Sequence, residues 1–123
     1  MWNKLACGNV LVVGAARSGI AVANLFKALG CEVTVNDKRE IGLLRDNLAS
    51  LKEGIKVSVG GHLLSLLDGT DLIVLSPGVP MDIPFLVEAR ARGIRVISEI
   101  EAAYQILTRF MQTMPFVGSM FWQ

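Results

Sequence analysis

The sequence predicts a doubly wound α/β domain, with a five-stranded parallel sheet in the strand order 3-2-1-4-5 and helices on both faces. Five short segments rich in β-branched residues alternate with segments of helical periodicity, as parallel strands and their right-handed crossovers require. The chain has 123 residues, the length of one ordinary domain, and its 52% apolar and 19% charged residues exclude a disordered chain. A net charge of +1, without a basic cluster, argues against a nucleic-acid binder.

The expected strands differ in how deeply they should be buried. Val10–Val13 and Leu72–Leu75 are apolar throughout, as central strands are when helices cover both faces of the sheet. Glu32–Asn36 and Lys56–Val59 alternate between polar and apolar residues, which favours places nearer an edge. The fifth expected strand is Arg95–Ile97.

Helical segments are expected between these strands. Gly30 and Gly54 should end the first two helices, because glycine readily adopts the left-handed conformation found there. The apolar stripes of these two helices are Val22, Leu25, Phe26 and Leu29, and Ile41, Leu44, Leu48 and Leu51. Residues 60–70 leave room for only a turn or two of helix.

The last two helices carry start signals. Asp82 should cap the helix after the fourth strand, with Pro84 in its first turn and Gly93 at its end. Ser98 and Glu101 fit a capping box at the start of the final helix. The apolar stripe of that helix is Ile100, Ala103, Tyr104, Leu107 and Met111. The aromatic residues expected in the core are Phe85, Tyr104, Phe110 and Phe116.

A glycine-rich turn, Gly14-Ala15-Ala16-Arg17-Ser18-Gly19, follows the first strand and opens the first helix. Gly14 should allow a tight turn, and Gly19 should let the helix approach the strand closely. The N–H groups and the positive dipole end of the helix N-terminus favour an anionic phosphate. Ala16 replaces the middle glycine of the dinucleotide pattern G-x-G-x-x-G, which weakens an NAD interpretation. The alternative is a plain strand-to-helix turn.

A polar segment, Asn36-Asp37-Lys38-Arg39, lies at the end of the second strand. Asp37 lies about where a dinucleotide fold places its ribose-binding acid, and its carboxylate can accept hydrogen bonds from ribose hydroxyls or a base N–H. The guanidinium of Arg39 can stack on a base or bind a phosphate. An ordinary polar loop that caps the next helix is the alternative.

A third loop, Ser76-Pro77-Gly78-Val79-Pro80, follows the fourth strand. Pro77 should hold Ser76 extended, and Gly78 should adopt a positive φ. In the expected strand order, this loop and the glycine-rich turn leave neighbouring strands on opposite faces, so together they should frame the ligand crevice. A rigid turn without a ligand is the alternative.

No metal-ligand or nucleophile–base constellation is visible in the sequence. His62 is the only histidine and has no Cys or acidic partner at ligand spacing, so we expect a surface residue. Glu99 and Glu101 are explained by helix capping and the helix dipole. Cys7 and Cys31 are too few for a disulfide scaffold, and we expect buried, reduced thiols. No run of about 20 apolar residues indicates a membrane span.

Taken together and in order, these loops resemble the N-terminal domain of the Mur ligases. The segments that carry the resemblance are VLVVGAARSG at 10–19, VTVNDK at 33–38, LSPGVP at 75–80, ISEIE at 97–101 and PFVG at 115–118. The resemblance covers roughly residues 10–118, and within the family it points to the members that attach D-glutamate.

The resemblance implies that the domain binds the UDP part of UDP-N-acetylmuramoyl-L-alanine. The loop at Arg17 and Ser18 would contact the diphosphate, and Asp37 and Lys38 would hydrogen-bond the uracil beside Arg39. The implied UDP-binding residues are Gly14, Arg17, Ser18, Gly19, Asp37, Lys38, Arg39, Ser76, Pro77 and Gly78. None of them would be catalytic or bind a metal. The full enzyme would use ATP and magnesium to form an acyl phosphate, which the D-glutamate amine attacks in peptidoglycan precursor synthesis.

The end of the sequence departs from the family pattern. The family continues into a G-x-x-G-K-[ST] phosphate-binding loop, whereas residues 119–123 read Ser-Met-Phe-Trp-Gln. We therefore expect a UDP-binding domain at residues 1–118, an atypical tail at 119–123, and no ATPase or C-terminal domain. Such a fragment would be inactive alone and would bind no cofactor. We expect a cytoplasmic monomer or weak dimer without nucleic-acid or membrane partners.

Three other interpretations stay open. A sibling Mur ligase that adds a different amino acid would share this domain. An NAD(P)-binding domain of a dehydrogenase or an ion-channel regulator would suit Lys38 and Arg39, which can bind a 2′-phosphate, although Ala16 and the Ser-Pro-Gly loop argue against it. The third is a folded domain that binds no ligand.

Overall fold

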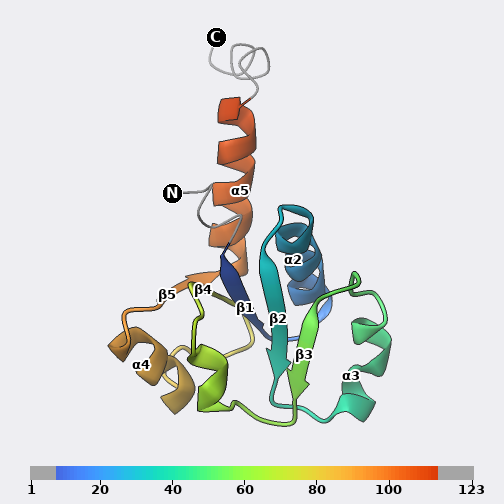
Figure 1. The fold of residues 1–123 in the computed structure, drawn as a ribbon. Coiled ribbons are helices and arrows are strands. Elements are labelled where there is room, and N and C mark those ends of the chain that lie inside the picture. Colours follow the sequence, from blue (N-terminus) through green and yellow to red (C-terminus); the bar gives the residue numbers. More distant parts are fainter. Residues whose placement is uncertain (1–7, 114–123) are drawn as a thin grey trace.

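The computed structural model describes residues 8–113. Five parallel strands form one sheet in the order β3-β2-β1-β4-β5, which confirms the predicted topology (Figure 1). The strands are β1 (Asn9–Val13), β2 (Glu32–Asp37), β3 (Lys56–Val59), β4 (Leu72–Leu75) and β5 (Arg95–Ser98). The helices are α2 (Arg17–Ala28), α3 (Ile41–Leu48), the 3-10 helix η1 (Leu64–Leu67), α4 (Pro84–Ala91) and α5 (Glu99–Thr113).

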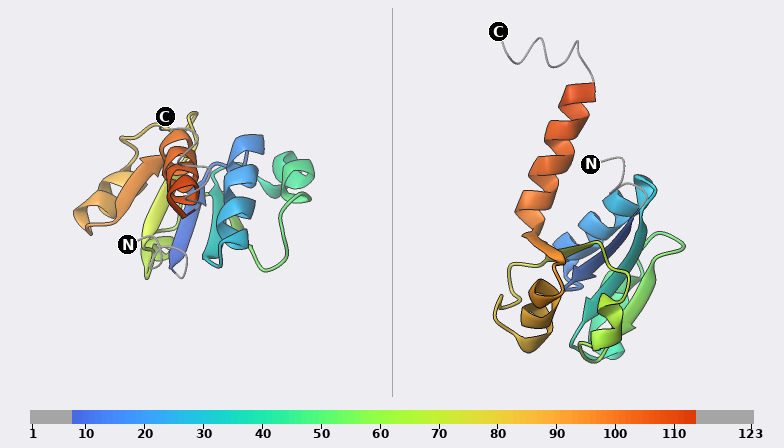
Figure 2. Two further views of the ribbon diagram at one scale, coloured as in Figure 1. Left: turned by 90° about the horizontal axis from the view of Figure 1, so that it is seen from above. Right: turned by 60° about the vertical axis from the view of Figure 1, so that its left-hand side comes forward.

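The side chains of the central strands fill two separate cores, one on each face of the sheet. On one face, Val10 and Val12 of β1 pack with Ala23 and Phe26 of α2 and with Ala102 of α5. Helices α2 and α5 lie side by side on this face (Figure 2). The other core joins β1 and β4 to η1 and α4 through Leu11, Val13, Leu67, Ile73, Leu75, Phe85, Leu86 and Ala89. Coverage of both faces explains why β1 and β4 are apolar throughout.

The register of the sheet brings the strand ends together. Val13, the last residue of β1, lies beside Asn36 of β2 and Leu75 of β4. The loops after β1, β2 and β4 therefore start at one level of the carboxyl edge, where doubly wound sheets bind ligands.

Helix α2 buries Phe26 of its predicted apolar stripe and partly buries Val22, but its packing face is shifted toward other residues. The buried residues of α2 are Gly19, Ile20, Ala23 and Phe26. Leu25 and Leu29, from the predicted stripe, are each 40% exposed. The small side chains turn toward the sheet because they allow a closer approach than leucine does. In α3, Leu44 is buried as predicted, whereas Ile41 is 54% exposed.

Helix α5 also presents its apolar stripe outward. The helix begins at the carboxyl edge and continues beyond the sheet, so only its early turns have neighbours to pack on (Figures 1 and 2). Ala102 is fully buried, whereas the expected stripe and core residues Ile100, Tyr104, Leu107 and Phe110 are exposed. Phe85 lies in the core as predicted, and Phe116 lies outside the described residues.

The helix ends follow the sequence signals with two exceptions. Helix α3 ends at Leu48, so Gly54 has a positive φ but lies beyond the helix that it was predicted to end. Gly30 and Gly93 adopt positive φ angles at helix ends, as predicted. Pro84 opens α4 as predicted, but the N-cap is Ile83 without a side-chain hydrogen bond, so Asp82 does not cap this helix. Ser98 Oγ accepts a hydrogen bond from the Glu101 N–H at 3.0 Å, which forms one half of the predicted capping box.

Other expectations concern the thiols and a membrane span. Cys31 is buried, as predicted, and Cys7 lies outside the described residues. Among the helices of residues 8–113, none has the length and apolar character needed to cross a membrane.

Candidate functional site

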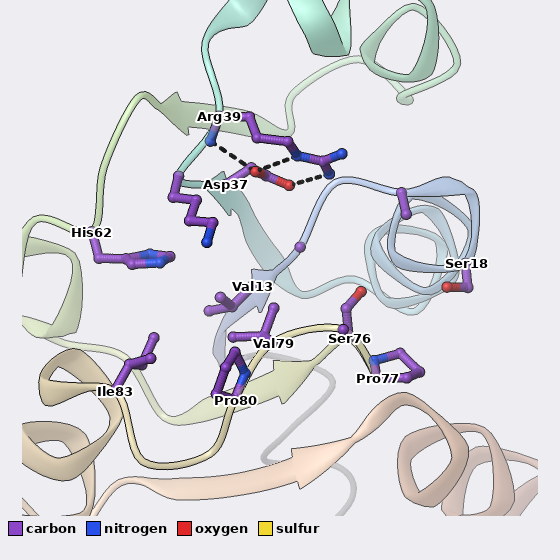
Figure 3. Close-up of a pocket in the computed structure, with 14 residues that line it drawn as sticks. Val13, Ser18, Asp37, Arg39, His62, Ser76, Pro77, Val79, Pro80 and Ile83 are labelled. Carbon is purple, nitrogen blue, oxygen red and sulfur yellow. Dashed lines mark hydrogen bonds and ion pairs between the residues drawn. The ribbon is translucent and has the colours of Figure 1, made fainter.

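A cavity of about 430 Å³ lies at the carboxyl edge between the loops that follow β1, β2 and β4 (Figure 3). This volume is typical of small-molecule sites. The predicted UDP-binding residues that line it are Gly14, Ser18, Asp37, Lys38, Arg39, Ser76, Pro77 and Gly78. Three further lining residues belong to the predicted loops: Ala16, Val79 and Pro80. Val13, His62 and Ile83 also line the cavity, and the sequence did not place them there. Arg17 and Gly19, also predicted, are not part of the lining.

The glycine-rich turn packs directly against the loop after β4. Gly14 has a φ of +112°, and a Cβ on it would lie 2.5 Å from both Cβ and Oγ of Ser76. Gly19 is buried beneath the turn, where a Cβ would overlap the Gly14 carbonyl oxygen. The two glycines therefore serve the tight turn and the close helix approach that the sequence predicted.

The start of α2 lies beside the cavity, which Ala16 and Ser18 line, and leaves N–H groups without partners in the helix. Its N-cap residue, Ala16, makes no side-chain capping hydrogen bond, and the first helical bond runs from the Ile20 N–H to the Ala16 carbonyl. The N–H groups of residues 17–19, in the first turn of the helix, consequently lack partners within the helix. Together with the positive dipole end, they form an anion-binding feature beside Ser18.

Asp37 is occupied by partners from its own domain. One carboxylate oxygen accepts hydrogen bonds from the Ala15 N–H at 2.8 Å and from Arg39 Nη2 at 2.7 Å. The other accepts from the Arg39 N–H and Nε, both at 2.9 Å. Burial alone would raise the pKa of Asp37, but these hydrogen bonds and the charge of Arg39 outweigh it and hold the pKa well below its usual value. Asp37 is thus ionised and fastens the glycine-rich turn to the end of β2.

The loop after β4 is held from behind by α5. Ser76 Oγ donates a hydrogen bond to Glu99 Oε2 at 2.5 Å, and both residues are buried. The helix dipole alone therefore does not account for Glu99, contrary to the sequence interpretation. Gly78 does not have the expected positive φ, and a Cβ on it would meet open space. Because Gly78 has no side chain, the cavity wall stays open at this residue, although the backbone there does not require glycine.

His62 belongs to the site, and its assignment to the surface was wrong. It is half-buried, its ring stacks on Phe85 with centroids 5.3 Å apart, and its Nδ1 lies 2.6 Å from Asn36 Oδ1. Burial lowers the pKa of His62 below 6.5; the charge of Asp37 opposes this shift, and that of Lys38 reinforces it. Sequence reasoning missed the residue because residues 60–62 fold back onto the end of β2, where the Gly60 N–H donates to the Asp37 and Arg39 carbonyls.

Within residues 8–113, no group of three or more His, Cys, Asp or Glu side chains could hold a metal ion. The cavity instead combines an anion-binding helix start, two cationic side chains on Lys38 and Arg39, and an apolar wall from Val79, Pro80 and Ile83. This combination suits a ligand that has an anionic end and a flat or apolar end.

Comparison with protein families gives a match over most of the chain. The family described as "Mur ligase MurD-like, N-terminal domain" matches residues 8–98. The UDP-N-acetylmuramoylalanine--D-glutamate ligase of Staphylococcus carnosus is 45% identical over 98 residues, which are 80% of this chain and 22% of that protein. The ligase of the same name from Exiguobacterium sibiricum is 49% identical over 105 residues, or 84% of this chain and 23% of that protein. The chain thus spans about a fifth of the length of these relatives.

Solved structures share the fold. The UDP-N-acetylmuramate-alanine ligase MurC of Thermotoga maritima matches with a TM-score of 0.66 at 23% identity, over 82% of this chain and 23% of that one. A pseudomurein peptide ligase type C from Methanothermus fervidus matches with a TM-score of 0.63 at 30% identity, over 80% and 20%. Shikimate dehydrogenase from Aquifex aeolicus matches with a TM-score of 0.55 at 14% identity, over 82% and 46%, which shows a common fold alone.

Proposed function

Because the chain belongs to the Mur ligase family through its MurD-like N-terminal domain, we propose that it binds the UDP part of UDP-N-acetylmuramoyl-L-alanine. The relatives named above are ligases that join D-glutamate to that substrate, as their names state. The proposal assigns this chain the substrate-holding part of the same reaction, in peptidoglycan precursor synthesis.

The observation that carries the proposal is the cavity at the carboxyl edge, with the uncapped start of α2 beside Ser18 and the cations of Lys38 and Arg39 on its rim. Open N–H groups and positive side chains favour a diphosphate, which has two charged groups to satisfy. The apolar wall opposite suits the flat face of a base. In this proposal, Gly14 and Gly19 shape the turn. The backbone at Arg17 and Ser18 and the Ser18 hydroxyl contact the diphosphate, and Pro77 and Gly78 bound the nucleotide from the facing loop.

The chemistry of the whole ligase is a further part of the proposal. ATP and magnesium would activate the substrate carboxyl group, and the D-glutamate amine would displace the phosphate. The printed sequence contains no G-x-x-G-K-[ST] pattern, which supplies the phosphate-binding backbone and lysine of such sites. We therefore expect no ATP hydrolysis and no amide formation by these 123 residues alone. Phosphate release with MgATP, D-glutamate and the muramoyl substrate should equal that of a blank without protein.

The direct test is titration of the 123-residue chain with UDP, ADP and NADPH, followed by NMR chemical shifts. UDP should bind with a dissociation constant on the order of 0.1–10 mM, because contacts from the rest of a complete ligase are missing. Shifts should concentrate at residues 14–19, 37–39 and 76–78. NADPH binding at micromolar concentration without UDP binding would instead favour a dehydrogenase-type domain and refute the proposal.

A matched pair of lysine variants locates the ligand. Lys38 lines the cavity, whereas Lys52 is an exposed lysine outside it. Lys38→Ala should weaken UDP binding, and Lys52→Ala should leave it unchanged at the same ionic strength. Equal effects of the two substitutions would mean that the nucleotide is held only by the general charge of the protein.

A further inference from the structure

We propose that His62 is a specificity residue of the UDP site, whose Nε2 accepts a hydrogen bond from a donor group on the nucleoside. The donor is an O–H of the ribose or the ring N–H of the base. This assignment rests on the proposed function and adds to it a residue and a hydrogen-bond direction.

The Asn36 side chain is completely buried, and its hydrogen bonds determine its orientation. Its Nδ2 lies 2.9 Å from the Ser58 carbonyl oxygen and 2.8 Å from the Gly61 carbonyl oxygen. Carbonyl oxygens only accept hydrogen bonds, so the atom between them must be the amide nitrogen with its two hydrogens. The other end of the side chain is therefore the oxygen Oδ1, which can only accept.

The orientation of Asn36 determines the tautomer of His62. Asn36 Oδ1 lies 2.6 Å from His62 Nδ1, and because that oxygen only accepts, Nδ1 must carry the proton. Burial lowers the pKa of the ring, which keeps it neutral at pH 7. A neutral ring protonated on Nδ1 has a lone pair on Nε2. Stacking on Phe85, which is itself buried, holds the plane of the ring.

The lone pair of His62 Nε2 belongs to a ring that lies in the cavity. His62 lines the cavity and points its ring into it, at the opposite end from Ser18 (Figure 3). The hydrogen bond to Asn36 is the one contact of a ring nitrogen found within residues 8–113, and it uses Nδ1. Since a diphosphate belongs at the start of α2 near Ser18, the opposite end of the cavity receives the nucleoside.

His62 differs from Asp37, the other acceptor expected to bind the nucleoside, in how many of its hydrogen bonds are already made. All the hydrogen-bonding capacity of the Asp37 carboxylate is used by Ala15 and Arg39. A ligand donor can reach Asp37 only by displacing one of them. His62 Nε2 needs no such exchange, so it is the side-chain acceptor that a nucleoside meets first.

The test follows the ring nitrogens of the untagged chain, in which His62 is the only histidine. A long-range 1H–15N spectrum should show the proton on Nδ1 before UDP is added. On saturation with UDP, the Nε2 resonance should move toward the hydrogen-bonded range while Nδ1 changes little. UDP analogues with a methyl group on N3, or without the 2′- or 3′-hydroxyl, then identify the donor, because only the analogue that lacks it should fail to shift Nε2.

The variant His62→Phe keeps a ring against Phe85 and removes the acceptor. It should weaken UDP binding roughly 2- to 13-fold, the range expected for one neutral hydrogen bond. It should also bind UDP as tightly as it binds the analogue that fails to shift Nε2 in the wild-type chain. Leu63→Ala, an exposed neighbour outside the cavity, serves as the control for disturbance of the loop.

The outcomes separate the two proposals. If the wild-type chain binds UDP but neither Nε2 nor any analogue responds, the assignment of His62 is refuted and the proposed function stands. If the wild-type chain does not bind UDP, the proposed function itself fails. Because the analogue and 15N measurements use the wild-type chain, the assignment stays testable even if His62→Phe, which leaves Asn36 Oδ1 without its donor, does not fold.

Discussion

Asp37→Asn should destabilise the domain considerably, although the substitution barely changes the size of the side chain. The carboxylate accepts from the Ala15 N–H and Arg39 Nη2 on one oxygen, and from the Arg39 N–H and Nε on the other. An asparagine side chain offers one oxygen and one NH2 group. Whichever way it is turned, its NH2 group faces two N–H donors that have no acceptor left.

The size of the effect follows from which donors can escape to water. The side chain of Arg39 is 45% exposed and can turn toward solvent, so its ion pair with Asp37 contributes little by itself. The Ala15 N–H belongs to a fully buried residue, where a donor without a partner costs about 1–3 kcal/mol. The asparagine oxygen should therefore turn to keep this hydrogen bond, and its NH2 group should face the backbone N–H and Nε of Arg39. Because the hydrogen bond to Ala15 loses its charge and the Arg39 N–H loses its acceptor, we expect a loss of about 1–2 kcal/mol in the free energy of unfolding.

The matched control is Asp68→Asn, which removes the same charge from an exposed ion pair. The Asp68 side chain is 74% exposed and lies 3.0 Å from Arg92. Such pairs contribute about 0–1 kcal/mol, so this variant should unfold almost like the wild type. In urea denaturation, with a slope of about 1–3 kcal/mol per molar, Asp37→Asn should lower the midpoint by about 0.5–1 M. Equal midpoints for the two variants would refute the assigned role of Asp37.

Three further predictions concern stability. Gly19→Ala should destabilise the domain by about 1–3 kcal/mol, because the new Cβ would overlap the Gly14 carbonyl oxygen. Gly42→Ala in α3, where the new Cβ meets open space, should stabilise it by about 0.5–1 kcal/mol. The urea midpoint should fall in the first variant and rise in the second. Ser98→Ala should remove the cap of α5 and cost about 0.5–2 kcal/mol, measured in the same way. Because the pKa of His62 is lowered in the folded chain, the unfolded chain binds a proton more readily than the folded one does. The free energy of unfolding should therefore fall as the pH drops below 6.5, and this part of the fall should be absent in His62→Gln.

The fold could be predicted from the sequence because its signals are local and redundant. Apolar runs identified β1 and β4 as central strands, and glycines marked the ends of helices. The predicted packing faces were less accurate, because a stripe of large apolar residues does not show which side of a helix a small residue will bring close to the sheet. In α2, Gly19 and Ala23 decide the buried face, and Leu25 and Leu29 remain exposed.

The cavity loops were predictable for the same reason, since topology alone places the ends of β1, β2 and β4 together. The contribution of His62 was not, because it depends on a hydrogen bond to Asn36, which is 26 residues away in sequence. The link between Ser76 and Glu99, 23 residues apart, is of the same kind. Sequence periodicity reports the direction of a side chain within its own element, and says nothing about a hydrogen-bond partner supplied by another element.

The hydrogen bonds of Asp37 also determine how a ligand can use it. Arg39 presents two side-chain N–H groups to the carboxylate, and its own side chain is 45% exposed. The guanidinium can therefore leave at small cost, whereas the backbone N–H groups of Ala15 and Arg39 cannot. A ligand that offers N–H or O–H donors would replace the side chain of Arg39 and leave the glycine-rich turn fastened. Arg39 thus keeps the carboxylate ionised and satisfied until such a donor arrives, which lets one acidic residue both hold the turn and remain open to exchange.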